Sequence, residues 1–554
     1  MPTTGADLFV EALESYGVTH LFGNPGTTEL PLLQALGRSD VDYVLGLHED
    51  VAVGAAAGYA MRRRYHAHED DGVLPLGVAN VHLAGGVAHG LSNLLNADFS
   101  GAPLLLTAGA HSRGFQHEEP ILSGDAVALT RQFTKWSAEV KDVDALPRMV
   151  RRAVQVALTP PTGPVFLALP LDVQLAEADR EPERLGRVPT AGRGDEAAVA
   201  EAASVVAAAD EPVVVLGDGV ARSGAVDAAV RFAEAAGARV HGEILAAETN
   251  FPTAHDQWQG SLPIRPEAAA EAMAVDTLTF VGCSTNTTLT RSPVQLVPDG
   301  ATCVHVTDDA WELGKHAPAD VAVLGDPGAV LDDLAERVER AVDDDTRRER
   351  LDRVHEWTAT DGRDPPETLD GTLTKTGLAR ALRRAAPGAI LVNESITASP
   401  ALNAEFPFDP TQLLSAKGGS LGYGLPAAVG AAVAEREAES DRRVLAYVGD
   451  GSYLYYPQTL YTAARYDLDL TVVIPDNRNY RILKDNTAAL LGGEPDDYTY
   501  DGVDFDPPVD LVANAESHGA TGLRVDSPAE VDDTLAAALD HDGPVVVDVP
   551  VTDR

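Results

Sequence analysis

Short apolar runs alternate with helix-like segments along most of the chain, and this alternation constrains the fold more than any other feature. Runs rich in Val, Leu and Ala recur in three regions, each followed by polar or Gly-rich residues. Such alternation predicts parallel strands joined by helices that cover both faces of a sheet. We therefore expect an α/β protein with three doubly wound parallel sheets. The expected strands lie at residues 18–22, 43–47, 74–81, 103–109 and 165–169 in the first region, at 213–216, 238–241, 277–282, 303–306 and 321–324 in the second, and at 389–393, 444–448, 470–474 and 545–549 in the third.

Two polar stretches separate the three regions. Residues 180–195 are rich in charge, Pro and Gly, and residues 341–370 are charged and then rich in Pro and Thr. Both compositions are typical of linkers. We predict an N-terminal domain at residues 1–180, a middle domain at 196–340 and a C-terminal domain at 370–554. The first and third domains share a plan, because polar residues stand at the ends of their strands.

The chain is strongly acidic, with 85 Asp and Glu against 42 Lys and Arg and a formal net charge of −43 at pH 7. The acidic residues are spread along the whole chain and would repel a phosphate backbone, which excludes a nucleic-acid binder. Such a charge is tolerated best where salt screens it. We interpret the composition as that of a protein from a halophile; the alternative is an ordinary acidic cytosolic protein.

The sequence carries no signal for export or for a membrane. Its first residues lack the basic and apolar regions of a signal peptide, and no run reaches the roughly 18 apolar residues of a membrane span. The two cysteines, Cys283 and Cys303, fall in separate strand-like runs and fit reduced core thiols. These features predict a cytoplasmic protein that does not bind a membrane.

A turn in the third region has the composition of a phosphate and metal site. Residues 449–452 read Gly-Asp-Gly-Ser, residues 476–479 read Asp-Asn-Arg-Asn, and each segment follows a strand-like run. In an open parallel sheet, ligands bind at this edge. Asp450 offers a carboxylate oxygen and Asn477 an amide oxygen, the kind of ligand that Mg²⁺ takes together with substrate phosphates. The glycines on either side of the aspartate let a phosphate approach the backbone.

A second Gly-Asp-Gly turn, at residues 217–219, also follows an apolar run. No strand ending in Asn comes after it at a comparable distance, since Leu245 stands at that position. We interpret residues 217–219 as a strand-to-helix turn that needs glycine for its backbone.

Five segments in order along the chain resemble the benzoylformate-decarboxylase branch of the thiamine-diphosphate decarboxylase and acetolactate-synthase superfamily. The Gly-Asp-Gly turn followed by Asn477 resembles the diphosphate–Mg²⁺ motif of that family. The resemblance covers essentially the whole chain and implies a pyrimidine-binding (Pyr) domain, a middle domain and a diphosphate-binding (PP) domain. The matching segments are residues 23–26 (Gly-Asn-Pro-Gly) with 29–31 (Glu-Leu-Pro), the strand-end Glu49, residues 80–82 (Asn-Val-His), residues 107–109 (Thr-Ala-Gly), and, in the third region, residues 391–395, 419–428 and 449–452.

The resemblance implies thiamine diphosphate as cofactor and three catalytic residues in the N-terminal domain. Glu49 would hydrogen-bond the aminopyrimidine ring and so promote activation of the thiazolium carbon, and desolvation raises a carboxyl pKa toward the working pH. His82 resembles the histidine that moves protons to and from the covalent intermediate. Thr27 falls where the family has a small group facing the substrate carboxylate. The structural alternatives are a capping glutamate, a core histidine and a capping threonine.

The resemblance also implies a set of cofactor residues, mostly in the C-terminal domain. Asp450, Asn477 and the backbone carbonyl of Asn479 would hold Mg²⁺. Leu421 would lie under the cofactor and hold its bent shape, the alternative being a plain core leucine. Ser395 and Thr397 would contact the diphosphate, with helix capping as the alternative. The expected cofactor-binding residues are Glu49, Ser395, Thr397, Gly419, Leu421, Gly449, Asp450, Gly451, Ser452 and Asn477.

Two departures from the family bear on the reaction. Benzoylformate decarboxylases carry a second active-site histidine from the middle domain, and residues 282–289 contain none. Acetolactate synthases usually carry Gln-His in the cofactor loop, where residues 418–421 read Gly-Gly-Ser-Leu, and Gln where Ala110 stands. These departures speak against benzoylformate itself and against a true acetolactate synthase. Ile482 and Leu483 would give the acyl pocket apolar walls, suited to an aromatic or branched 2-oxo acid.

We therefore expect a thiamine-diphosphate-dependent 2-oxo-acid decarboxylase that releases an aldehyde and can also ligate aldehydes. One alternative is an acetolactate-synthase-like carboligase, for which FAD in the middle domain is possible but not favoured. An alternative of another class is a non-catalytic nucleotide-binding or regulatory protein. In the family the first domain of one subunit faces the third domain of another, so the resemblance implies a homodimer or homotetramer with active sites at the interface.

Overall fold

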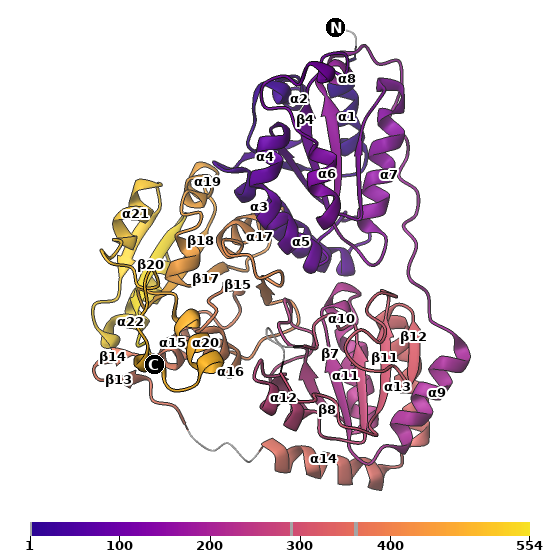
Figure 1. Ribbon diagram of the computed structural model, residues 1–554, viewed down its shortest axis with the longest axis vertical. Helices are drawn as coiled ribbons and strands as arrows, with labels where there is room; N and C mark the ends of the chain where they lie inside the picture. The colour runs from indigo at the N-terminus through magenta and orange to yellow at the C-terminus, as the bar shows by residue number, and fades with distance from the viewer. Residues whose placement is uncertain (1–2, 288–291, 359–363, 554) are drawn as a thin grey trace. The chain divides into compact units, whose positions relative to one another are not determined.

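The computed structural model describes residues 3–287, 292–358 and 364–553, and three six-stranded sheets organise them (Figure 1). The chain forms two compact units. One unit comprises Met1–Val188, Pro366–Phe406 and Leu414–Arg554, and the other Pro189–Pro365 and Pro407–Leu413. The first unit contains the N-terminal and C-terminal sheets and the second contains the middle sheet. Within the described residues, no helix is both long and apolar enough to cross a membrane.

The N-terminal domain is a parallel sheet with strand order β2-β1-β3-β4-β6-β5. Its central strands are buried along their whole length, as expected of a parallel sheet covered on both faces. The strands are β1 His20–Gly23, β2 Asp42–Leu45, β3 Gly77–Val81, β4 Leu104–Ala110, β5 Trp136–Glu139 and β6 Val165–Pro170, and the helices are α1 Gly5–Ser15, α2 Leu30–Leu36, α3 Glu49–Glu69, α4 Leu83–His89, α5 Leu91–Phe99, α6 Ala126–Thr130, α7 Leu146–Leu158 and α8 Leu171–Leu175.

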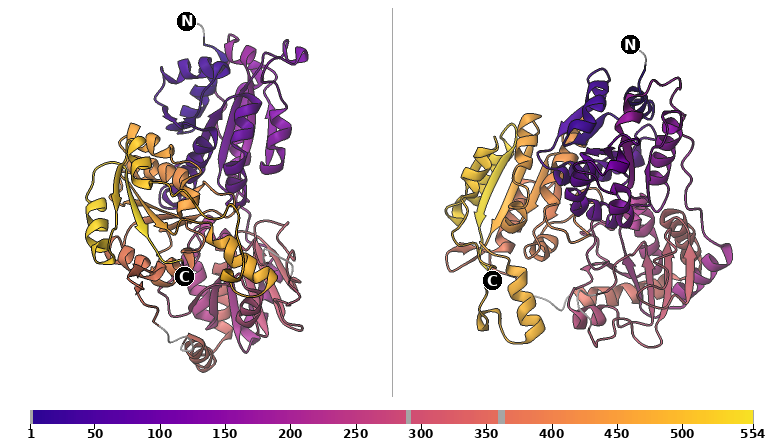
Figure 2. Two further views of the ribbon diagram at one scale, coloured as in Figure 1. Left: turned by 60° about the vertical axis from the view of Figure 1, so that its left-hand side comes forward. Right: turned by 45° about the horizontal axis from the view of Figure 1, so that its top comes forward.

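The C-terminal domain repeats this topology. Its sheet has the order β16-β15-β17-β18-β20-β19, which is the N-terminal order with the strands renumbered. In Figure 2, helices lie on both sides of these strands, coloured orange to yellow. The strands are β15 Ile390–Glu394, β16 Leu413–Ser415, β17 Val444–Val448, β18 Leu470–Asp476, β19 Thr521–Arg524 and β20 Val545–Pro550, after a hairpin of β13 Thr368–Leu369 and β14 Thr372–Leu373, and the helices are α15 Lys375–Ala385, α16 Ser399–Glu405, α17 Gly424–Glu437, α18 Asp450–Tyr453, α19 Thr459–Arg465, α20 Arg481–Leu491, α21 Leu511–Ser517 and α22 Val531–Leu539.

The middle domain has a different strand order, β12-β11-β10-β7-β8-β9. Counted along the chain this is the order 6-5-4-1-2-3, which is that of dinucleotide-binding sheets. The strands are β7 Pro212–Leu216, β8 Arg239–Gly242, β9 Trp258–Ser261, β10 Thr277–Val281, β11 Thr302–Thr307 and β12 Val321–Leu324, and the helices are α9 Glu196–Ala208, α10 Gly219–Arg222, α11 Val226–Ala236, α12 Pro266–Ala272, α13 Pro327–Ala341 and α14 Asp344–Thr358.

The prediction of three parallel-sheet α/β domains is confirmed, and each predicted strand has a counterpart in these sheets. The prediction of a linker at residues 341–370 is wrong in part, because α14 occupies Asp344–Thr358. Arg350 of this helix is buried and donates hydrogen bonds to the backbone carbonyls of Ala207 and Ala236. Because polar contacts hold this helix in place, its sequence does not show the broad apolar stripe by which a helix is predicted. Residues 359–363 of the predicted linker lie outside the described residues.

Helix α3 of the N-terminal domain packs directly against α17 of the C-terminal domain, and glycines allow the contact. A Cβ on Gly58 would lie 2.3 Å from the carbonyl oxygen of Ala427, and a Cβ on Gly430 would lie 1.9 Å from that of Ala55. Real side chains do not tolerate such distances, so the backbones meet only because both positions are glycine. The two domains therefore share one hydrophobic core.

Two carboxylates at the end of α17 add ion pairs to this contact. Glu437 accepts a hydrogen bond from Tyr59 at 2.6 Å and lies 2.7 Å from Arg63, and Glu435 pairs with Arg62 and His66. Burial acts to raise the pKa of both glutamates, but these partners outweigh it and lower the pKa of each to about 2. The glutamates are thus ionised at neutral pH and hold the two domains together.

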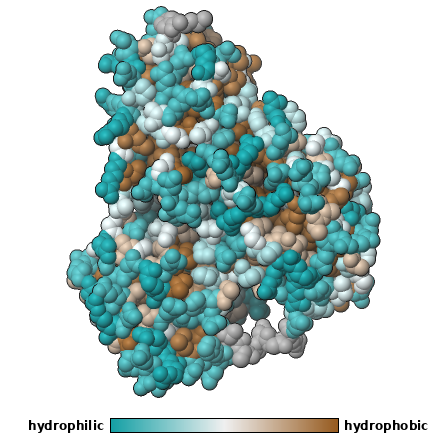
Figure 3. Space-filling model, turned by 180° about the vertical axis from the view of Figure 1, so that it is seen from behind, coloured by the Kyte–Doolittle hydropathy of each residue, from teal (hydrophilic) through white to brown (hydrophobic). Residues whose placement is uncertain are grey.

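Hydrophilic residues cover most of the face shown in Figure 3, with hydrophobic residues in scattered groups. Several large apolar side chains are nevertheless exposed near the end of α20, among them Leu490 at 64% and Leu491 at 71%.

The helix contact predicts an unusual response to a small substitution. Ala is normally favoured over Gly in a helix by about 1 kcal/mol, but in Gly430→Ala the new methyl group meets the carbonyl of Ala55. We expect the free energy of unfolding in urea to fall by about 1–3 kcal/mol, as for an overpacked core. Gly388→Ala is the control, because a Cβ at Gly388 would meet nothing within 4 Å. Equal stability of the two variants would contradict the close contact.

Candidate active site

A pocket lies at the carboxyl-terminal edge of the C-terminal sheet, where β15, β17 and β18 end. All of its lining residues belong to the C-terminal domain. Gly419, which the sequence also assigns to the cofactor, does not line it within the described residues. Predicted cofactor and metal residues that do line it are Ser395, Thr397, Leu421, Gly449, Asp450, Gly451, Ser452, Asn477 and Asn479.

The backbone conformation of the Gly-Asp-Gly turn, from an extended residue to the start of a helix, places the turn at this pocket. Strand β17 is buried throughout, and α18 begins at Asp450, directly after the extended Gly449. A Cβ on Gly451 would lie 2.5 Å from the ring of Tyr480. Glycine is therefore required at 451, and the turn brings backbone N–H groups close to the pocket where a phosphate can reach them.

Asp450 is a buried carboxyl group with no ion pair among the described residues. Its Oδ1 accepts a hydrogen bond from the N–H of Gly451 at 2.9 Å, whereas its buried Oδ2 accepts none within the described residues. Burial, together with the negative charge of neighbouring Asp476, raises the pKa of Asp450 to about 7. A divalent cation would satisfy the free oxygen and oppose both effects, because it favours the charged carboxylate.

The two asparagines present further oxygens to the same pocket. The Oδ1 of Asn479 is buried and has no hydrogen-bond partner in the described part of the chain. The amide nitrogen of Asn477 is occupied by a hydrogen bond to Asp553 at 3.0 Å, which leaves its oxygen for another ligand. Carboxylate and amide oxygens are the donors that Mg²⁺ takes. The residues present therefore fit Mg²⁺, and Asn479 offers a side-chain oxygen in addition to the predicted backbone carbonyl.

Two basic residues of the pocket were not predicted as cofactor residues. Lys375, the first residue of α15, and Arg481, the first residue of α20, both line it. Burial lowers the pKa of Lys375, against the attraction of Asp553. Both cations suit a diphosphate. No sequence signal links Lys375 to the Gly-Asp-Gly turn. Arg481 directly precedes Ile482 and Leu483, the two residues predicted to form apolar walls of the acyl pocket. Ile482 lines the pocket, whereas Leu483 is 47% exposed.

The loop that carries Leu421 is held from both domains. The buried carboxylate of Glu394 accepts hydrogen bonds from the N–H groups of Gly422, Tyr423 and Gly424 at 2.8–3.1 Å, and burial raises its pKa to about 7. From the N-terminal domain, Asn96 of α5 donates to the carbonyl of Ser420 at 2.9 Å. Gly419 has a φ of +73°, which only glycine adopts without strain. Its role in the structure is to shape the loop that presents Leu421.

Glu49 stands at the corresponding edge of the N-terminal sheet. It is the first residue of α3, its side chain is 12% exposed, and its Oε2 lies 3.0 Å from Nδ1 of His89. The capping side chain of α3 is that of His48, which accepts the N–H of Asp50 at 3.1 Å. The capping interpretation of Glu49 is therefore wrong, and its carboxyl group is available to a ligand. Among the described residues, His48, Glu49 and His89 also form a cluster of metal-ligand type.

His82 follows β3 and contacts a buried carboxylate. Its Nδ1 lies 2.7 Å from Oε2 of Glu29 and 3.2 Å from the hydroxyl of Thr28. Glu29 is 1% exposed and also accepts the N–H groups of Gly26 and Gly109 at 2.9 and 2.8 Å. This carboxylate orients the His82 ring and leaves Nε2 for proton transfer. Glu29 lies in one of the segments that resemble the family, but the resemblance implies no role for it.

Thr27 precedes Thr28, whose hydroxyl contacts His82, but Thr27 itself lies on the surface. It is exposed, opens a short 3₁₀ helix Thr27–Glu29, and its hydroxyl makes no hydrogen bond within the described residues. The residue before α2 is Glu29, with no side-chain cap. Thr27 is thus not a capping residue, and its hydroxyl is free to meet a ligand.

The second Gly-Asp-Gly turn, in the middle domain, has a structural role. Asp218 is fully buried and accepts hydrogen bonds from the N–H groups of Ala247 and Glu248 and from the side chain of Asn250, at 3.0–3.1 Å. These hydrogen bonds satisfy the Asp218 carboxylate within the middle domain. The prediction that residues 217–219 form a structural turn is confirmed.

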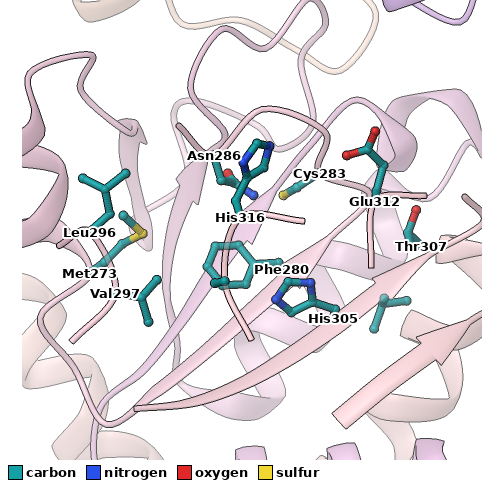
Figure 4. Close-up of a pocket in the computed structure, with 12 residues that line it drawn as sticks. Met273, Phe280, Cys283, Asn286, Leu296, Val297, His305, Thr307, Glu312 and His316 are labelled. Carbon is teal, nitrogen blue, oxygen red and sulfur yellow. The ribbon is translucent and has the colours of Figure 1, made fainter. Parts of the chain in front are cut away.

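A small pocket at β10 and β11 of the middle domain contains several polar side chains (Figure 4). His305, His316 and Cys283 line it, and burial lowers the pKa of His305 to about 4, so this ring is neutral. The cavity, about 30 Å³, has room for roughly one water molecule. His316 is a histidine of the middle domain, but it lies outside the stretch 282–289 that corresponds to the second active-site histidine of benzoylformate decarboxylases. Residues 288–289 of that stretch lie outside the described residues.

A Gly-Asp-Gly turn beside oxygen-bearing and basic side chains at one sheet edge, with a strand-end glutamate at the matching edge of a second sheet, is the arrangement expected of a thiamine-diphosphate-binding protein. Three family models match the chain: "Thiamine pyrophosphate enzyme, N-terminal TPP binding domain" at residues 3–135, "central domain" at 199–334 and "C-terminal TPP binding domain" at 400–549. The chain belongs to the thiamine pyrophosphate enzyme family.

Individual relatives lie in two branches of this family. A benzoylformate decarboxylase of Pseudomonas aeruginosa is 32% identical over 545 residues, covering 98% of this chain and 97% of the relative. A probable acetolactate synthase large subunit of Methanocaldococcus jannaschii is 28% identical over 568 residues, covering 99% and 92%. The solved structure of a thiamine diphosphate-dependent 4-hydroxybenzoylformate decarboxylase of Rhodococcus jostii RHA1 is 30% identical, covers 99% of both chains and has a TM-score of 0.87.

Proposed function

We propose that this enzyme uses thiamine diphosphate and Mg²⁺ to decarboxylate an aromatic or branched 2-oxo acid to an aldehyde, with carboligation of aldehydes as a second activity. The observation that carries the proposal is the pocket in which Asp450, Asn477 and Asn479 present oxygens beside Lys375 and Arg481. Relatives named as benzoylformate and 4-hydroxybenzoylformate decarboxylases support the substrate class. The cytoplasm, where 2-oxo acids are available, is the location we propose.

In this proposal the C-terminal domain anchors the cofactor. Asp450, Asn477 and Asn479 would hold Mg²⁺, and the turn from Gly449 to Ser452 would bind the diphosphate through N–H groups. Lys375 would add a positive charge beside it, and Ser395 and Thr397 would add hydroxyl groups. The bound cofactor supplies an electron sink for the carbanion left when CO₂ departs.

The N-terminal domain would supply the groups that place protons. Glu49 would hydrogen-bond the aminopyrimidine ring, because its side chain is mostly buried and does not cap α3. His82, oriented by Glu29, would transfer protons through Nε2. Thr27 would face the substrate carboxylate with its free hydroxyl, and the apolar Ile482 would contact the acyl chain in the other domain.

A second candidate is an acetolactate-synthase-like carboligase, which the relatives named as acetolactate synthases support. It would condense 2-oxo acids, and FAD in the middle domain would be compatible with the dinucleotide-type strand order there. FAD remains the less favoured cofactor, because residues 418–421 and Ala110 differ from the acetolactate-synthase pattern. A non-catalytic regulatory protein is the third candidate, and it predicts no turnover.

We also propose that each active site is shared by two subunits of a homodimer or homotetramer. The pocket at Asp450 is lined by C-terminal residues alone, whereas Glu49 and His82 lie at the edge of another sheet. A second copy of the chain would bring an N-terminal edge to each C-terminal pocket. Symmetric closed dimers are the commonest soluble oligomers.

A panel of 2-oxo acids tests the reaction. With thiamine diphosphate, Mg²⁺ and high salt, we expect aldehyde from benzoylformate-like aromatic acids or from branched acids, with turnover from pyruvate at least tenfold slower. Acetolactate as the main product from pyruvate would favour the second candidate. Cofactor binding without turnover of any acid would favour the regulatory one. Aldehydes and hydroxyketones are measured separately by chromatography.

Glu49→Gln tests the assigned role of the carboxyl group. We expect thiamine diphosphate to bind within a few-fold of the wild-type affinity, while turnover falls by about 10²–10⁴-fold, the usual contribution of acid–base catalysis. Glu69→Gln, at the exposed end of the same helix, is the matched control. Co-expression of Glu49→Gln with Asp450→Asn should then restore about a quarter of the wild-type activity, because a symmetric dimer with shared sites forms one intact site in each mixed pair. Failure to restore activity would contradict shared sites.

The acidic composition predicts that salt stabilises the protein, as expected for a halophilic source. Raising KCl from 0.2 to 2 M shortens the screening length to about 3 Å or less and reduces repulsion among the acidic residues. We expect the melting temperature to rise steadily over this range. Sucrose at matched osmolality is the control for general exclusion effects. A melting temperature independent of KCl would support the ordinary acidic protein instead.

A further inference from the structure

The end of the chain lies beside the proposed Mg²⁺ site. After β20 ends at Pro550, the N–H of Val551 donates to the carbonyl of Asp476 and the N–H of Thr552 donates to that of Leu373, both at 2.9 Å. These bonds extend the sheet by two residues and bring Asp553 next to Asn477. The position of Asp553 is therefore determined by backbone hydrogen bonds.

The Asp553 carboxylate contacts both asparagines of the site. Its Oδ1 accepts hydrogen bonds from the amide nitrogens of Asn477, at 3.0 Å, and Asn479, at 3.2 Å. Its Oδ2 accepts one from Arg481 at 3.2 Å. One carboxylate thus holds two amide groups and is itself held by a guanidinium group.

These hydrogen bonds decide which end of each amide faces the pocket. An asparagine side chain has a donating nitrogen and an accepting oxygen, and a carboxylate accepts only. Because both nitrogens turn toward Asp553, both oxygens turn away from it, and the Oδ1 of Asn479 is buried without a partner in the described residues. The Asn479 nitrogen also donates to the backbone carbonyl of Asn477 at 2.7 Å, so this amide has a second support. Without the carboxylate, the Asn477 amide could rotate and present a nitrogen to the cation, and the Asn479 amide would keep only its bond to the backbone.

We propose that Asp553 is a positioning residue that orients Asn477 and Asn479 for Mg²⁺ binding, so that the C-terminal segment is part of the cofactor site. This inference rests on the proposed function. Groups that orient metal ligands typically contribute a factor of 10–100 to metal affinity. Arg481 keeps the carboxylate in place and balances its charge.

Titration of Mg²⁺ into the full-length protein at saturating thiamine diphosphate, followed by calorimetry, tests the proposal. We expect Asp553→Ala to bind Mg²⁺ about 10–100-fold more weakly than the wild type. Asp553→Asn should fall between them, because its amide group retains one accepting oxygen and presents a nitrogen to another donor. Asp542→Asn is the matched control, since it removes the same charge from an exposed position eleven residues upstream; its affinity should equal that of the wild type.

The unfolding midpoint of the protein without metal and cofactor separates positioning from a merely structural role. We expect it to be the same in wild type, Asp553→Ala and Asp553→Asn. Wild-type Mg²⁺ affinity in Asp553→Ala, or a loss of affinity that accompanies a lower midpoint, would overturn the proposal. If Asp553→Ala does not fold, Asp553→Asn decides by the same criteria. A wild-type protein that binds neither thiamine diphosphate nor Mg²⁺ would overturn the proposed function and this inference together, whereas equal binding by wild type and variants would overturn this inference alone.

Discussion

The arrangement of the first unit depends on the direct contact between α3 and α17. Glycines at 58 and 430 allow the two backbones to touch, and the ionised Glu435 and Glu437 pair with side chains of α3 at the end of the contact. Helix α3 begins at Glu49, and α17 follows the loop that presents Leu421. The helix pair thus sets the positions of two proposed cofactor residues, Glu49 and Leu421.

Charge is the second constraint. Asp450, Asp476 and Asp548 are all buried in the C-terminal domain, and burial together with repulsion from Asp476 raises the pKa of Asp450 and of Asp548. Carboxylates of this kind need a cation or a proton. Arg524 pairs with Asp548, whereas Asp450 has no such partner among the described residues. A cation bound at the pocket would therefore lower the pKa of Asp450 more than that of Asp548. The proposed Mg²⁺ site therefore contains a buried carboxyl group without an ion-pair partner among the described residues. Asp553, from the segment after β20, and Arg481, the first residue of α20, lie beside it and pair with each other.

Much of the fold was predictable, and so were the parts of the site that lie in short motifs. Parallel strands are buried on both faces and therefore appear as apolar runs, and Asp450 and Asn477 follow such runs directly. Lys375 and Asp553 are not predicted as site residues, because each reaches the site from a distant segment through the start of a helix or the pairing of strands. Glu29 lies in a matching segment, but its contact with His82, 53 residues away, arises only when β1 pairs with β3. Helix α14 was taken for a linker because buried Arg350, rather than an apolar stripe, holds it in place.

The class of fold, the three-domain order and the family follow from the amino-acid sequence, because apolar periodicity and strand-end motifs are local properties of the chain. Which motif is the proposed ligand site and which is structural depends on contacts between distant segments. Gly449–Asp450–Gly451 leaves a buried carboxylate oxygen facing a pocket, whereas the same three residue types at 217–219 direct their carboxylate to backbone N–H groups. Identical local sequences differ here because hydrogen bonds from distant residues decide whether a buried charge is already satisfied.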